Sequence, residues 1–342
     1  MHIRNLHLTF LSPAFLGNAT QTSQWRTPPI KALLRQWWRV AVAHELSFNV
    51  ERLRQREGEL FGVAADGAGS RQSQIRIRLG HWNPGTLKDW TRLGTVKHPD
   101  VTSPVGSDLY LGYGPLIYEK SKGTALKNNA AIQAGENAAL RLAFPEEFAS
   151  EIATALWLMD RYGSLGGRSR NGWGSVSLEA QGDTPALTGT LDDRLTLPWQ
   201  DALRRDWPHG LGTDGKGTLI WATPAFDDWT KLMRELASLK IGLRTQFKFP
   251  HQRADGHIHP RHWLSYPVTN HKVDAWGNNA RLPNSLRFKV RPAPSNPKQC
   301  VGVIFHVPCL PPPAFRPDLH AITDVWQDVH KFLDQSLSRV SA

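Results

Sequence analysis

Cysteines and long apolar runs are scarce in this sequence of 342 residues. The only two cysteines, Cys300 and Cys309, cannot form a disulfide framework, so we expect a reducing, cytoplasmic setting. No run approaches the roughly 18 apolar residues that a membrane-spanning helix needs. The first ten residues alternate polar and apolar like a strand, which predicts no secretory signal.

Basic and aromatic residues are abundant. Lys and Arg total 41 against 30 for Asp and Glu, and 27 of the 41 are arginines. Arginine offers a planar fork of donors that suits phosphates and stacks on flat rings, so the excess favours a nucleic-acid partner over a merely soluble basic surface. The 14 Trp and 13 Phe exclude a long disordered chain.

The periodicity of apolar residues predicts two similar α+β halves. In the first half, strands are expected at 2–11, 72–79, 137–144 and 173–178, and helices at 27–44, 50–61 and 145–162. A further strand is expected at 109–113. In the second half, strands are expected at 218–223, 263–268, 285–290 and 301–307, and helices at 227–239 and 318–337.

The order of strands and helices in each half is that of the split βαβ unit. We therefore predict an α+β fold with two ferredoxin-like (RRM-like) domains in tandem, at 1–190 and 218–342. Residues 191–217 carry several Pro and Gly and are expected to link them. In the strand at 72–79, Arg76 and Arg78 form a basic outer face.

The Gly-rich loop, residues 163–174, has five glycines in twelve residues. Glycines keep side chains away, so backbone N–H groups can approach a phosphate. The predicted RNA contacts are Gly166, Gly167, Arg168, Ser169 and Arg170, with Trp173 as a stacking face. A dinucleotide fingerprint is excluded because this loop leaves a helix and enters a strand. The alternative is a plain helix-to-strand turn.

Two other segments suggest phosphate contacts at first sight. Lys31, Arg35 and Arg39 share one face of the first helix at i, i+4 and i+8, and no acidic residue interrupts that stripe. This favours an RNA contact over a solvated basic face. Residues 210–216 nearly match a P-loop, but Gly217 stands where Ser or Thr must bind magnesium, so a nucleotide site is excluded.

The sequence predicts no metal, cofactor or catalytic site. The histidines at 251–262 lack the spacing of a closed zinc site, so a mobile basic loop that touches RNA is the preferred interpretation. No paired-carboxylate motif and no GxSxG motif occurs. A metal-independent ribonuclease would need a histidine base at the scissile 2′-OH, and no histidine lies in a recognisable catalytic context.

The stretches FLSPAFLGNATQTSQWRTPPIKALLRQWWR (10–39) and LWLMDRYGSLGGRSRNGWGSV (156–176) resemble the RAMP superfamily of CRISPR proteins. The tandem Trp37-Trp38 and the stretch Arg281–Lys289 are most similar to the family of the first subunit of the type III-B (Cmr) effector complex. One departure is Ala32, where that family is expected to have Gly.

The resemblance implies a non-catalytic subunit of an antiviral interference complex. Such a subunit would contact the 3′ region of the guide (CRISPR) RNA, the target RNA and neighbouring RAMP subunits. The predicted RNA-binding residues are then the basic residues of the first helix, those of the Gly-rich loop, Arg281 and Lys289. Two alternatives stay open. One is a metal-independent RAMP endoribonuclease that processes CRISPR repeat RNA. The other is a scaffold that mainly makes protein contacts, with a positive charge that complements an acidic neighbouring protein.

Overall fold

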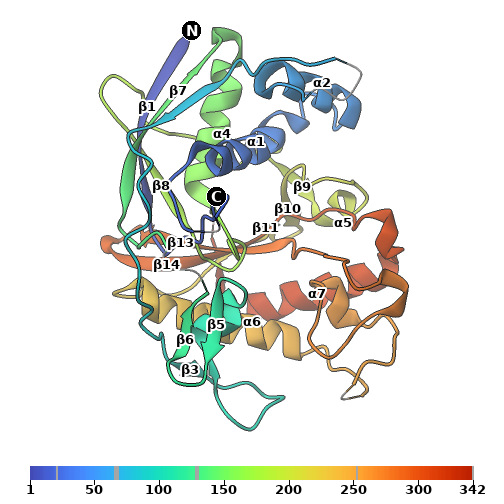
Figure 1. The fold of residues 1–342 in the computed structure, drawn as a ribbon. Coiled ribbons are helices and arrows are strands. Elements are labelled where there is room, and N and C mark those ends of the chain that lie inside the picture. The colour runs from blue at the N-terminus through green and yellow to red at the C-terminus, as the bar shows by residue number, and fades with distance from the viewer. Residues whose placement is uncertain (21, 65–68, 128–130, 252, 341–342) are drawn as a thin grey trace.

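The computed structural model describes residues 1–20, 22–64, 69–127, 131–251 and 253–340. The chain forms a mixed α+β fold around two four-stranded sheets, which confirms the predicted α+β class. The first sheet and its helices occupy the upper half of Figure 1, and the second sheet crosses the middle with its helices below it. No helix within these ranges is both long and apolar enough to cross a membrane.

The first sheet has the strand order β2-β7-β1-β8, and every neighbouring pair is antiparallel. Helices α1 and α4 pack against each other on one face of this sheet, and α2 follows α1 (Figure 1). The bounds are β1 His2–Phe10, α1 Thr27–Ala43, α2 Val50–Phe61, β2 Arg76–Leu79, β7 Asn137–Phe144, α4 Ala149–Tyr162 and β8 Val176–Ala180.

Local sequence signals explain these elements. Strand β1 alternates, so that Leu6, Leu8 and Phe10 are buried on its inner face. Helix α1 begins with Pro28 and Pro29, whose missing N–H groups cost nothing in the first turn. Its tandem tryptophans are both fully buried in the first of two apolar cores, which lies between the first sheet and its helices. The second core lies between the second sheet and its helices.

The second sheet repeats the arrangement with the order β13-β14-β12-β15, again antiparallel throughout. Helices α6 and α7 cover the face that belongs to the second core. The bounds are β12 Ile220–Ala222, α6 Trp229–Thr245, β13 Leu286–Ala293, β14 Asn296–His306, α7 Leu319–Ser336 and β15 Ser338–Arg339. Asp228 and Asp318 cap α6 and α7 by accepting hydrogen bonds from backbone N–H groups of the first turns.

The other face of the second sheet packs against the first half. Val303 and Phe305 of β14 belong to the first core, whereas Phe288 and Ile304, which point the other way, belong to the second. Lys289 of β13 is completely buried at this junction. The two halves therefore share an extensive apolar contact rather than a flexible hinge.

Shorter elements fill the connections. They are β3 Thr95–Val96, β4 Val105–Gly106, α3 Ser107–Gly112, β5 Leu116–Glu119, β6 Gly123–Leu126, η1 Glu146–Phe148, β9 Thr196–Pro198, α5 Trp199–Ala202, β10 Leu211–Asp214, β11 Gly217–Thr218, η2 Pro260–Trp263, η3 Asp274–Trp276 and η4 Pro313–Phe315. Residues 191–217, expected to be a linker, contain strands β9 and β10 of a small three-stranded sheet.

Two predicted strands are wrong. Residues 109–113 lie mostly in helix α3, where the buried Asp108 accepts a hydrogen bond from Trp90 Nε1 at 2.8 Å, a long-range contact that no local pattern encodes. Residues 263–268 begin in η2 and continue irregularly, with isolated bridges from Tyr266 to Leu282 and from Val268 to His271. Pro267 has no N–H group to donate to a strand ladder, which disfavours a regular strand at this position.

Candidate nucleic-acid interface

A pocket of 1360 Å³ opens where the two halves meet. Its lining comes from the segment that leads into α3, the end of the Gly-rich loop, one face of α6 and the loops on either side of η2. We call it the cationic pocket. Its charged lining consists of seven basic residues and one acidic residue: Arg168, Arg170, Lys240, Arg244, Lys248, Arg261, Arg281 and Asp100.

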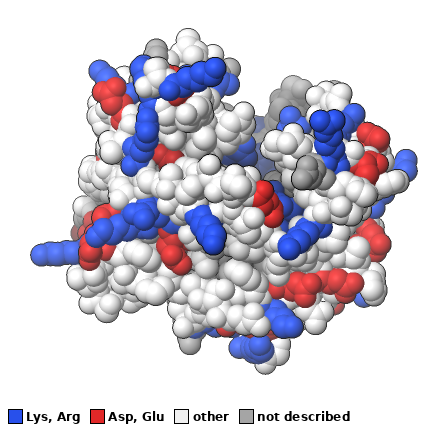
Figure 2. Space-filling model, turned by 90° about the horizontal axis from the view of Figure 1, so that it is seen from below, with Lys and Arg blue, Asp and Glu red and all other residues white. Residues whose placement is uncertain are grey.

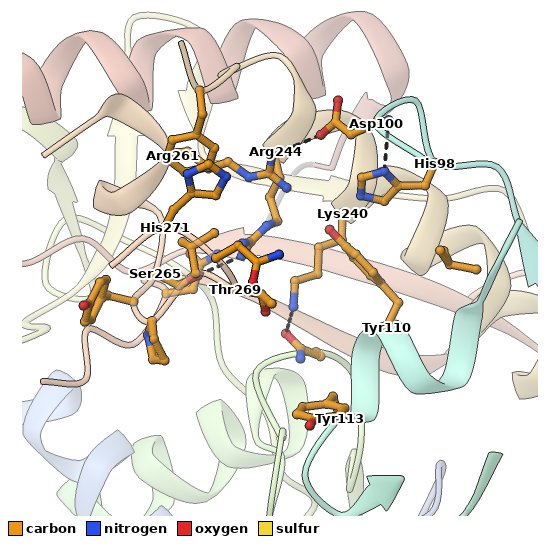
Figure 3. Close-up of a pocket in the computed structure, with 18 of the residues that line it drawn as sticks. His98, Asp100, Tyr110, Tyr113, Lys240, Arg244, Arg261, Ser265, Thr269 and His271 are labelled. Carbon is orange, nitrogen blue, oxygen red and sulfur yellow. Dashed lines mark hydrogen bonds and ion pairs between the residues drawn. The ribbon is translucent and has the colours of Figure 1, made fainter. Parts of the chain in front are cut away.

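Helix α6 supplies the floor of the cationic pocket. Lys240 and Arg244 are four residues apart, so both project from the same face of the helix (Figure 3). Lys240 Nζ donates to Asn171 Oδ1 at 2.7 Å, and Arg244 donates to Ser265 Oγ at 2.8 Å. Burial, together with the positive charges of Arg244 and Arg168, holds the pKa of Lys240 well below its ordinary value.

The cations of the pocket are under-neutralised. Asp100 accepts from Arg261 at 3.2 Å, and it is the only carboxylate in the lining. Within the described ranges, the buried Nε atoms of Arg244 and Arg261 have no hydrogen-bond partner. Like charges gathered around a single carboxylate cost free energy, and a bound anion would lower that cost.

The Gly-rich loop adds two arginines to the wall. Arg168 adopts a left-handed backbone conformation, with φ of 56°, and its Nε donates to Tyr113 O at 2.6 Å. Arg170 donates to Asn284 O at 2.6 Å and so ties the loop to the second half. Strained non-glycine residues of this kind persist where the surrounding structure holds a side chain in place.

Aromatic rings stand beside the cations. Phe249 and His271 stack with ring centroids 3.6 Å apart, and both line the pocket. Tyr110 lies to one side of Lys240, as Figure 3 shows, and Tyr113 is 64% exposed. Cations interleaved with accessible rings can hold phosphates and stack on bases at the same time.

One face of the molecule carries charged side chains of both signs. Figure 2 views the molecule from below, and there the Lys and Arg side chains are mixed with Asp and Glu. Such a mixed surface attracts a polyanion less than a lining with one carboxylate among seven cations does.

Four predicted site residues line the pocket. Arg168, Ser169 and Arg170 belong to the Gly-rich loop, and Arg281 lies shortly before β13. The glycines have a different role from the one predicted. A Cβ on Gly166 would lie 2.7 Å from Phe15 O, and Gly167 N donates to that same oxygen at 2.9 Å. The loop therefore packs against its own chain, and it presents side chains rather than backbone donors to the pocket.

The predicted stacking role of Trp173 is wrong, because its side chain is completely buried in the second core. Lys289 is also misplaced by the prediction. Its Nζ donates to the carbonyls of Met159 and Asp160 at the end of α4, so it holds the two halves together and cannot reach an RNA in this structure. A buried ammonium needs such acceptors.

The expectation that the stripe on α1 lacks an acidic partner is also wrong. Glu57 of α2, whose side chain is 3% exposed, accepts hydrogen bonds from both Arg35 and Arg39. Lys31 donates to Phe61 O and Ser73 Oγ. The three cations bind α1 to its neighbouring elements. The spacing within α1 could not reveal Glu57, because this residue lies on another helix.

Glu57→Gln is expected to lower the free energy of unfolding by about 1–3 kcal/mol, because two charge-assisted contacts between α1 and α2 are lost. RNA binding should stay unchanged, since the stripe lies outside the cationic pocket. Chemical unfolding and an RNA-binding titration measure the two effects. Glu59→Gln, which removes a partly exposed carboxylate of the same helix, is the control and should cost less than about 1 kcal/mol.

Sequence reasoning missed the cations at the C-terminal end of α6 and just after it. Lys240, Arg244 and Lys248 have the same i, i+4, i+8 spacing as the stripe on α1, so the signal was present. Two residues of the His-rich segment, His251 and Arg261, line the pocket, and the RNA contact of this segment stays a prediction. No group of three or more His, Cys, Asp or Glu able to hold a metal occurs in the described part of the chain.

The geometry defines an α+β protein whose two halves enclose a pocket lined by cations and aromatic rings. Residues 7–177 match the family model of the RAMP superfamily, and the chain belongs to that superfamily. No curated protein matches the sequence.

Several solved structures are similar to this chain. One is the crystal structure of Cmr1 from Pyrococcus furiosus in its apo form, with 15% identity, a TM-score of 0.47, and coverage of 99% of this chain and 98% of that one. Another is a chain of the type III-B Cmr-beta complex bound to cognate target RNA and AMPPnP, with 10% identity, a TM-score of 0.48, and coverage of 98% and 99%. A chain of a type IV-B CRISPR complex shows 14% identity, a TM-score of 0.33, and coverage of 56% and 94%.

Proposed function

We propose that this RAMP protein is a non-catalytic RNA-binding subunit of a cytoplasmic type III-B CRISPR interference complex in antiviral defence. In this proposal it contacts the 3′ region of the guide RNA and the target RNA, and it assembles with other RAMP subunits. The observation that carries the RNA contact is the cationic pocket, with seven cations, one carboxylate and two buried guanidinium N–H groups without acceptors.

The strand order supports a division into two ferredoxin-like units, which we propose at 1–190 and 218–342. Numbered by their place in the chain, the four strands of each sheet stand in the order 4-1-3-2, with a helix after the first strand and another after the third. That connectivity is the split βαβ pattern. The cationic pocket then lies between the two units, where residues of both contribute charge.

The test removes three side chains at the pocket while leaving the fold intact. Arg168, Lys248 and Arg281 are exposed, so R168A/K248A/R281A should fold normally. Its affinity for a labelled single-stranded RNA should fall at least tenfold in low salt, as followed by fluorescence anisotropy. The slope of log K against log salt should become shallower by about 2, because three phosphate contacts are lost.

The matched control is K88A/R234A/K298A, which removes the same charge from exposed positions outside the pocket lining. It should keep nearly the whole salt slope of the wild type. Equal slopes for the two triple variants would refute the pocket as the RNA site and leave only a diffuse charge effect.

One observation favours the endoribonuclease as a second candidate. His98 and His271 share the pocket, and burial lowers the pKa of each, so imidazoles that can accept a proton stand among cations. Incubation of the protein with a repeat transcript in EDTA separates the two functions. We expect intact RNA. Cleavage that H271A abolishes would establish the enzyme instead.

A further inference from the structure

The outer face of the first sheet carries three arginines. Arg76 and Arg78 of β2 and Arg141 of β7 are all exposed, and they point away from the helices. Arg78 and Arg141 are direct partners in the register of the two strands. Like charges directly opposite each other destabilise a sheet. None of the three arginines has an ion-pair partner among the described residues.

Among the described residues of these strands, the rest of this face carries no Phe, Tyr or Trp that could serve as an aromatic platform. Ala139 and Ala143 of β7 and Asn5 of β1 flank the arginines, and Ile3 is 42% exposed. The acidic residue on the same face, Glu179, lies on β8 at the far edge of the sheet. Single-stranded nucleic acid binds best where aromatic rings stack on its bases, so this face is poorly suited to it.

The second sheet shows what covers such a face within this molecule. Strand β13 has the same place in its sheet as β2 has in the first, and it also carries alternating cations on its outer face. Lys289 donates to the last carbonyls of α4, and the guanidinium of Arg287 lies 5.7 Å from the ring of Trp37. The covering element is thus the C-terminal turn of a helix together with an aromatic ring.

We infer that the outer face of β2, β7 and β1 docks a neighbouring protein subunit, which presents a helix C-terminus or carboxylates to Arg76, Arg78 and Arg141. The free carbonyls and the dipole of a helix C-terminus are negative, and carboxylates accept the arginine fork in two places. Arginine at the centre of an interface often contributes strongly to its affinity. This inference rests on the proposed function, because the neighbour is another subunit of the same complex.

The experiment is co-expression of the full-length chain with the other subunits and guide RNA of a type III-B complex. The variant R78E/R141E reverses the two facing arginines at exposed positions, so the isolated chain should unfold at nearly the wild-type temperature. We expect its occupancy in the purified complex, measured by native mass spectrometry, to fall at least tenfold. K88E/K298E makes the same charge change elsewhere and should assemble like the wild type.

The outcomes separate this inference from the proposed function. If the wild-type chain does not join the complex, the proposed function fails and the neighbour inferred here fails with it. If the wild type and R78E/R141E join equally well, the docking face alone is refuted. If R78E/R141E assembles but loses single-stranded RNA binding as R168A/K248A/R281A does, the face binds RNA and protein docking is overturned.

Discussion

Replacing Trp173 by alanine is expected to lower the free energy of unfolding by about 3–5 kcal/mol, the usual cost of truncating a buried tryptophan. The side chain is fully buried and meets Phe15, Trp90 and Trp229 edge to face, with centroids 5.4 to 6.2 Å apart. It reaches from the first half into the second core, so its loss loosens the junction beside the cationic pocket. Urea unfolding followed by circular dichroism measures the change.

The variant W173F distinguishes a core residue from an RNA-stacking residue. Phenylalanine keeps one six-membered ring in the core and loses the five-membered ring of the indole, whose Nε1 has no hydrogen-bond partner among the described residues. It should therefore cost no more than about 2 kcal/mol and leave the RNA affinity within twofold of the wild type. A stable W173A protein with a tenfold weaker RNA affinity would contradict the buried role and restore the stacking role.

Most of the regular elements could be predicted because their signals are local. Strand β7 alternates exposed and buried residues along its whole length, and α7 has one apolar stripe behind an Asp cap. The wrong strand at 109–113 had a long-range cause. Helix α3 is held by Asp108, which binds Trp90 and also accepts from Leu93 N, and such contacts leave no periodic trace in the sequence.

The cations of the site could be predicted in kind but not in place. The spacing of Lys31, Arg35 and Arg39 identifies a shared face, but it cannot reveal that Glu57 of another helix neutralises it. The same spacing in Lys240, Arg244 and Lys248, at the end of α6 and just after it, belongs to the pocket. Only the tertiary structure distinguishes a cation that forms an ion pair between two helices from a cation that lines the pocket.

The glycine content of the loop at 163–174 also has two possible structural explanations. Five glycines in a loop are compatible with a phosphate cradle, but close packing of the chain on itself requires glycine equally well. A Cβ on Gly174 would lie 1.9 Å from Leu165 O, and Gly174 N already donates to Pro13 O. The loop is glycine-rich because two chain segments cross there, and the crossing places Arg168 and Arg170 in the wall of the pocket.

The stability of the protein should rise from pH 7 to pH 10 because of Lys289. Burial lowers the pKa of Lys289 to about 7, whereas a lysine in the unfolded chain titrates near 10.5. Between these values the unfolded chain binds more protons than the folded chain, so the free energy of unfolding increases with pH. Below pH 7 both states are protonated and the contribution stays constant.

Lys289→Met isolates this effect, because it keeps the length of the side chain and removes the titrating group. The free energy of unfolding of the wild type minus that of the variant should grow on the order of 3 kcal/mol from pH 7 to pH 10, since each unit of pKa difference is worth about 1.4 kcal/mol. Urea unfolding at several pH values gives both curves, and the other titrating groups cancel in the difference. Parallel curves would show that Lys289 stays charged between the halves, held by the carbonyls of Met159 and Asp160.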